Sequence, residues 1–164
     1  MARNTTKAHR ASGQFKIAPA AAMLACLAVI AIADTPADSL RRIEAEISQG
    51  RAGQAVAEID AGLRGWSSTE LPIAFMARGK ARMALARQAT TPEDQKKLYV
   101  QAGVDFMRVA VLFPYSPQAP DALLLAGQSC ASAGNSAGAT AIYQTLTSKY
   151  PDSQAARQAK ETQK

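Results

Sequence analysis

Histidine and cysteine are nearly absent from this sequence. The single histidine is His9, and the two cysteines are Cys26 and Cys130. Ser-His-Asp and Cys-His catalysis both need a histidine, which is also the commonest metal ligand. Because His9 and Cys26 fall in a segment that we assign below to targeting, the remaining chain has one cysteine and no histidine. It can form neither of these catalytic sites, nor a thiolate metal cage, nor an intramolecular disulfide.

Other catalytic signatures are also missing. The glycines fit no phosphate-cradling G-x-x-x-x-G-K-[ST] loop. Neighbouring carboxylates such as Glu93 and Asp94 are expected on exposed helix starts, where a solvated surface role is the simpler interpretation. We therefore predict that the protein is not an enzyme, has no catalytic residues and binds no cofactor or metal.

Acidic residues are missing from the first 33 positions. Residues 1–16 contain four basic residues, and residues 17–33 (IAPAAAMLACLAVIAIA) contain no charge and end in Ala31-Ile32-Ala33. This order of basic region, apolar run and A-x-A site predicts a secretory signal peptide cleaved after Ala33. Two alternatives stay open, namely retention of the run as an N-terminal membrane anchor and lipidation at Cys26. Each predicts an exported protein, in the periplasm or anchored facing it.

The high pI of 9.6 is a poor indicator of nucleic-acid binding. Without the four basic residues of the first 33, the net charge falls from +6 to +2. No basic run interleaved with aromatic residues follows. We expect no nucleic-acid partner, and a membrane contact only through the N-terminal segment.

Residues 34–164 contain an internal repeat. One copy has small residues, large apolar or aromatic residues and a proline at fixed spacings: Gly127, Gly134, Ala139, Tyr143, Leu146 and Pro151. Its last four positions recur 37 residues earlier as Ala102, Phe106, Val109 and Pro114. A degenerate first copy places Gly50, Ala55, Ile59 and Trp66 at the offsets of Gly134, Ala139, Tyr143 and Tyr150.

The spacing of these residues predicts paired helices. Gly127, and Gly79 in the middle copy, are expected where two helices cross closely, with Ala139 facing that crossing. Gly134 suits the turn between helices, and Pro151 ends the second helix. The predicted helices are 38–49, 52–63, 70–87, 92–113, 117–133, 137–149 and 153–162. Thr91 is expected to cap the fourth, after an eleven-residue insertion in the middle copy.

These residues resemble the tetratricopeptide repeat (TPR), a helix-turn-helix unit of about 34 residues. The aromatic-Pro-x-Ser ending resembles bacterial envelope members, of the outer-membrane β-barrel assembly lipoprotein and cell-division coordinator types. The resemblance implies an all-α solenoid of three helical hairpins plus a short C-terminal helix. It also implies a non-catalytic scaffold that docks a protein or peptide in its concave groove. The alternative is a self-associating structural module of an envelope assembly.

The resemblance places six residues in that groove: Ile73, Met76, Lys80, Met83, Leu124 and Gln128. Met76 and Met83 would form an adaptable apolar surface, although packing between helices is an equal alternative for them. Arg78 and Arg82 are expected on a solvated face. We expect the aromatic residues Trp66, Phe113, Tyr115 and Tyr150 to pack between repeats.

Overall fold

The computed structural model describes residues 36–163, all within the unit Ala33–Lys164. Within these residues the chain forms seven α-helices and no strand. They are α1 (Pro36–Ser48), α2 (Ala52–Gly62), α3 (Leu71–Gln88), α4 (Pro92–Leu112), α5 (Ala119–Ser132), α6 (Ser136–Lys149) and α7 (Gln154–Thr162). The all-α prediction is confirmed for this part of the chain, with each helix end within two residues of its expected position. The predicted signal peptide or anchor, residues 1–33, lies outside the described residues.

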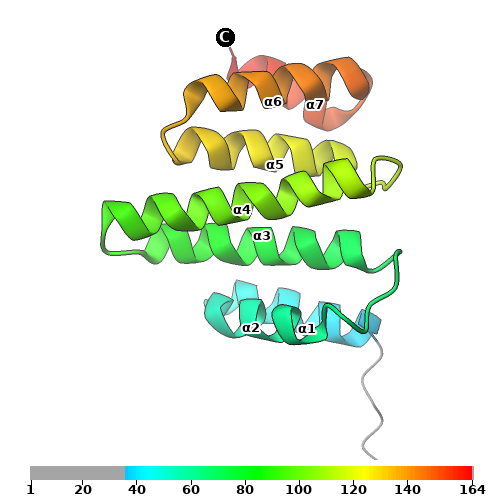
Figure 1. The fold of residues 1–164 in the computed structure, drawn as a ribbon, viewed down its shortest axis with the longest axis vertical. Helices are drawn as coiled ribbons and strands as arrows, with labels where there is room; N and C mark the ends of the chain where they lie inside the picture. Colours follow the sequence, from blue (N-terminus) through cyan, green and yellow to red (C-terminus); the bar gives the residue numbers. More distant parts are fainter. Residues whose placement is uncertain (1–35, 164) are drawn as a thin grey trace, which may run out of the picture. The chain divides into compact units, whose positions relative to one another are not determined.

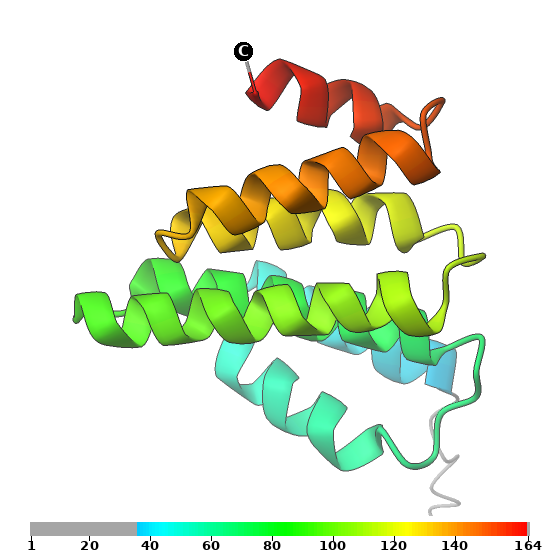
Figure 2. The ribbon, with the colours of Figure 1, turned by 45° about the horizontal axis from the view of Figure 1, so that its top comes forward.

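The helices stack in the order of the sequence (Figures 1 and 2). Each helix packs against the next one along the chain, and α1 also contacts α3, as α5 contacts α7. The middle pair is the longest, because α3 has 18 residues and α4 has 21, whereas α5 and α6 have 14 each. At their shared turn, α3 and α4 therefore extend beyond the turn that joins α5 to α6 (Figure 1).

Local sequence signals determine where the helices begin and end. Gly50 and Gly134 adopt positive φ angles of +79° and +84° in the turns after α1 and α5, a conformation that a side chain disfavours. Thr91 caps α4, because its hydroxyl accepts a hydrogen bond from the Asp94 N–H at 3.1 Å. The Asn135 side chain caps α6 in the same way through the Gly138 N–H at 2.9 Å.

The two crossing glycines make room for aromatic rings rather than for a neighbouring backbone. A Cβ added to Gly127 would lie 2.2 Å from the Tyr143 ring, and one added to Gly79 would lie 2.5 Å from the Phe106 ring. Phe106 and Tyr143 are the equivalent positions of the 37-residue repeat. The sequence therefore identified the right residues, but the close contact that requires glycine is between helix and ring.

In the first pair, two isoleucines occupy the positions that a glycine and an aromatic ring occupy in the other pairs. Ile43 stands where the crossing glycine would be, and Ile59 stands where the ring would be; both side chains are completely buried. Trp66 packs half-buried against the core formed by α1, α2 and α3, and its indole lies 3.0 Å from where a Cβ of Gly62 would be. The expected location of Trp66, at the junction of the first two pairs, is confirmed.

A hydrogen bond joins the ends of the second and third pairs. The Tyr150 hydroxyl donates to the Pro114 carbonyl at 2.7 Å, and Phe113 lies with its ring centroid 6.5 Å from that of Phe75. The packing between repeats expected for Tyr150 is therefore observed, whereas the ring contact of Phe113 lies within the second pair. The expectation for Tyr115 was wrong, because its side chain is 99% exposed.

Candidate partner-binding site

The six residues expected to line a concave groove do not share one surface. Met76, Met83 and Leu124 are buried, Ile73 and Gln128 are half-buried, and only Lys80 is exposed. Ile73 packs against the core of α1–α3, whereas Leu124 belongs to the core that α5 forms with α6 and α7. Burial leaves little of Met76, Met83 and Leu124 for a partner to contact, so the groove assignment of these three residues is not supported.

The two methionines fill space between helices. Met76 and Met83 from α3 belong to one buried cluster with Phe106 from α4 and Ala126 from α5. The flexible thioether side chain suits such an irregular gap. Of the two interpretations that the sequence left open for these methionines, interhelical packing is the one observed.

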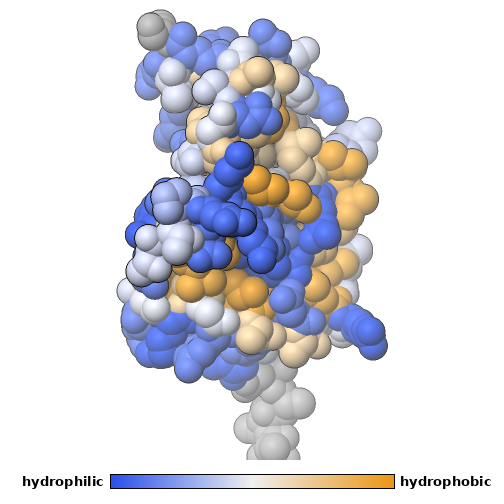
Figure 3. Space-filling model, turned by 60° about the vertical axis from the view of Figure 1, so that its left-hand side comes forward, coloured by the Kyte–Doolittle hydropathy of each residue, from blue (hydrophilic) through white to orange (hydrophobic). Residues whose placement is uncertain are grey.

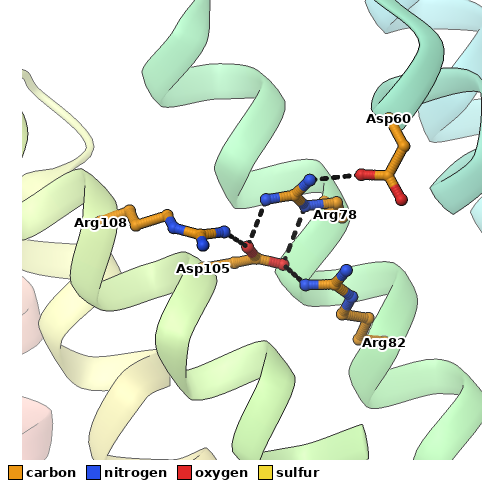
Figure 4. Close-up of polar contacts among 5 residues, drawn as sticks. All are labelled: Asp60, Arg78, Arg82, Asp105 and Arg108. Carbon is orange, nitrogen blue, oxygen red and sulfur yellow. Dashed lines mark hydrogen bonds and ion pairs between the residues drawn. The ribbon is translucent and has the colours of Figure 1, made fainter. Parts of the chain in front are cut away.

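Two arginines expected at a solvated face instead belong to a buried ion network (Figure 4). Asp105 on α4 is completely buried and accepts two hydrogen bonds from Arg78 of α3, at 3.0 Å from Nε and 2.6 Å from Nη2. Arg82 also donates to Asp105, and Arg108 Nη1 donates at 2.9 Å. Arg78 reaches further to Asp60 of α2. The expectation of a solvated face is thus wrong for Arg78, which is buried, and for Arg82, which is half-buried.

The network holds more positive than negative charge. Burial alone would lower the pKa of Arg78, but the hydrogen bonds and charges of Asp105 and Asp60 outweigh it, so the pKa is raised and the guanidinium stays charged. Three arginines share two carboxylates. Since each guanidinium has five N–H donors, Arg108, the most exposed of the three arginines, keeps donors that Asp105 does not use.

A row of exposed apolar side chains runs along α4. Val100 and Val104 are about half exposed, Val111 is 65% exposed and Leu112 is 61% exposed. The other side of the same helix contributes Ala102, Phe106 and Val109 to the core. Figure 3 shows that apolar surface gathers in patches beside strongly hydrophilic surface on one side of the molecule. A helix that is apolar on both sides needs a second partner for the uncovered side.

This row forms one wall of a groove of about 680 Å³, which we call the α4–α6 groove. Its lining consists of α4 residues between Lys96 and Leu112, Ala126 and Cys130 of α5 with the following turn, and Ile142 of α6. Among residues 36–163, the charged residues that line it are Lys96 and Arg108. Because α4 is longer than α5 and α6, its first turns extend past the turn that joins those two helices (Figure 1).

Sequence reasoning missed this groove, although a signal for it was present. The segment from Leu98 to Leu112 has apolar residues at two sets of helical spacings, one through 102, 106 and 109 and another through 100, 104 and 111. Only the first set was assigned to packing, since it matched the repeat. A second apolar set on a helix already buried on one side indicates a further contact surface.

Other candidate features are few among residues 36–163. No group of three or more His, Cys, Asp or Glu side chains there could hold a metal ion. No helix in that range is both long and apolar enough to span a bilayer. Cys130 is half-buried, is not in a disulfide, and lines the α4–α6 groove.

Comparisons with known proteins do not identify a relative. No family model matches the chain, and no curated protein matches it significantly.

Proposed function

We propose that this protein is a non-catalytic interaction module of TPR-like helical repeats that docks a partner protein in its α4–α6 groove. The observation that carries the proposal is the uncovered apolar row of α4. Covering the exposed parts of its four large side chains would contribute about 1 kcal/mol each. The proposal keeps the class of function that the repeat implies and places the docking surface outside the six residues first expected.

Support for TPR-like architecture comes from the repeat together with the contacts between its positions. Gly79 with Phe106 and Gly127 with Tyr143 make the same glycine-to-ring contact in consecutive pairs. The Tyr150-to-Pro114 hydrogen bond links two positions of the aromatic-proline ending. Stacked helix pairs of this kind offer extended surfaces for other proteins.

A site-specific crosslinking experiment tests docking. A photoreactive amino acid at Val104 in the full chain is expected to capture a discrete partner in cells, whereas the same residue at Gln144, an exposed position of α6, is expected not to. A Val104→Asp change should abolish capture from a probe at Val100, because it puts a charge into the apolar contact. Equal capture from both probe positions would contradict a specific docking surface.

The alternative assignment, a self-associating module, makes a separate prediction. If the groove joined two copies of the chain, sedimentation would show a dimer that Val104→Asp converts to monomer. A wild-type monomer at high concentration would leave a different protein as the occupant.

We also propose that the protein acts in the cell envelope. This rests on residues 1–33, whose basic start, uncharged run and Ala31-Ile32-Ala33 ending fit an export signal. The intact mass of the natural protein tests it: a mass that begins at Asp34 indicates cleavage, the full mass indicates an anchor, and added lipid indicates processing at Cys26. An uncleaved, unlipidated protein in the cytosolic fraction would contradict export.

A further inference from the structure

We infer that the α4–α6 groove binds an amphipathic helix of a partner protein whose apolar side is flanked by acidic residues about three turns apart. This inference rests on the proposed function and specifies the chemistry of the partner. It follows from the positions of charge and apolar surface around the groove.

The groove wall on α4 is a row of residues four positions apart. Lys96, Val100, Val104, Arg108 and Leu112 follow one another at this spacing, and all line the groove. Such i±4 rows are the ridges against which a second helix packs. The two cations are twelve residues apart, which corresponds to about 18 Å along the helix axis. A partner helix lying along this row would place its apolar anchors against the valines and its ends near the cations.

The charges of the groove lining have one sign. Lys96 and Arg108 line it, and no carboxylate of the described part of the chain does. Glu93 and Asp94 occupy the first turn of α4 but do not line the groove, and the Asp94 carboxylate accepts a hydrogen bond from the Thr91 hydroxyl at 2.7 Å. Charge complementarity therefore selects acidic groups at both ends of the bound segment.

Arg108 is held in place by its neighbours, unlike a freely rotating surface arginine. Its Nη1 donates to the buried Asp105 at 2.9 Å, and its guanidinium carbon lies 5.8 Å from the centroid of the Phe75 ring. The side chain is still 45% exposed, so its remaining donors can reach a carboxylate in the groove. Less conformational freedom is lost when a carboxylate binds a side chain that is already fixed.

The same charges disfavour two other occupants. A second copy of the chain that paired α4 with α4 would add another Lys96 and Arg108 to a surface that already has both. The apolar run of this chain at residues 17–33 has no acidic residue, and Lys16 precedes it. Neither occupant supplies acidic groups at both ends.

Two labelled peptides test the inference on the full chain. Both are helical and have the same leucine stripe; one has Glu residues about twelve positions apart at the ends of the stripe, and the other has Lys there. We expect the Glu peptide to bind at least about tenfold more tightly at low salt, with the difference shrinking as salt is added. It should also slow alkylation of Cys130, which peptide mapping distinguishes from Cys26.

A pair of adjacent lysines provides the matched variants. Lys96→Glu should weaken the Glu peptide about tenfold, whereas Lys97→Glu should change its affinity little, because Lys97 is exposed but does not line the groove. Both changes are on the surface of one helix, so neither is expected to unfold the protein. Equal effects of the two variants would overturn the inference, since the charge would then act only at long range.

The remaining outcomes separate this inference from the proposed function. Equal binding of the two peptides, or failure of both while Val104 still crosslinks a partner in cells, would overturn acid-flanked recognition and leave docking in place. Binding of the Glu peptide that Val104→Asp does not weaken would place it outside the groove and refute the inference. A dimer that Val104→Asp dissociates would replace the partner helix with a second copy.

Discussion

Replacing Asp105 by asparagine is the most informative test of the fold. Asn keeps the size of the side chain but removes the charge that balances Arg78, a residue whose side chain is only 5% exposed. Removing one partner of a buried ion pair typically costs about 3–5 kcal/mol. The lower end applies here, because Asp60 stays paired with Arg78 and is itself 47% exposed. We therefore expect Asp105→Asn to lower the free energy of unfolding by about 3 kcal/mol.

Urea unfolding followed by circular dichroism at 222 nm measures this change, and a thermal melt gives a second reading. For a unit of this size, a loss of about 3 kcal/mol lowers Tm by roughly 10 °C. The matched control is Asp152→Asn, an exposed aspartate after α6, for which the expected change is within about 0.5 kcal/mol. The double variant Arg78→Met/Asp105→Asn should recover at least about 1 kcal/mol, because it also removes the uncompensated buried charge.

One result would refute this reasoning. If Asp105→Asn were no more destabilising than Asp152→Asn, Arg78 would have to be solvated in solution, and the buried network would not exist as described. A double variant less stable than the Asp105→Asn single variant would show that the packing of the Arg78 side chain matters more than its charge.

Two further predictions concern the contacts that recur between repeats. Gly127→Ala should lower the free energy of unfolding by about 1–3 kcal/mol, because the new methyl group would lie 2.2 Å from the Tyr143 ring and the neighbouring atoms must shift; denaturant unfolding measures it. Tyr150→Phe should cost about 1 kcal/mol, since the Pro114 carbonyl loses its 2.7 Å hydrogen bond from the hydroxyl; the same assay measures it.

Each of these changes has a control elsewhere in the chain. Gly53→Ala, in α2 with no atom within 4 Å of the added Cβ, should be neutral or slightly stabilising, because alanine favours a helix. Tyr115→Phe removes a hydroxyl from a fully exposed side chain and should have no measurable effect. If a control variant changed the free energy of unfolding as much as its test variant, the loss would come from the type of substitution. The proposed contact would then be refuted as its cause.

The helices could be predicted from sequence because their ends depend on nearby residues. Thr91 with Pro92 begins α4, Gly134 with Asn135 separates α5 from α6, and each signal acts within a few positions. The 37-residue offset also indicates which positions correspond in successive repeats, and it correctly matches Phe106 with Tyr143. Information of this kind is local or periodic and can be read from one sequence.

The errors concern features that depend on long-range partners. Arg78 is buried because Asp105 lies 27 residues later, on a helix whose rotation no local pattern specifies. The α4–α6 groove is lined by residues of three helices, and which of their side chains meet there follows only after the helices are placed side by side. Tyr115 is part of the Phe113-Pro114-Tyr115-Ser116 ending, yet its side chain points to solvent. The repeat pattern predicts where a residue lies within its helix pair, but it does not predict whether the side chain points to the core or to solvent.

The two apolar sides of α4 raise the question of which side faces the core. Rotating the helix could bury Val100, Val104 and Val111 in place of Ala102, Phe106 and Val109, since both sets are apolar. Two features favour the observed rotation: Asp105 can meet Arg78 only from this side, and the Phe106 ring fits against Gly79. We propose that the buried ion pair specifies this rotation and thereby leaves the valine row available to a partner. Asp105→Asn should then broaden the NMR signals of valine methyl groups on α4 even under conditions where the protein is still folded. Sharp, single resonances in that variant would show that packing of Phe106 alone is sufficient.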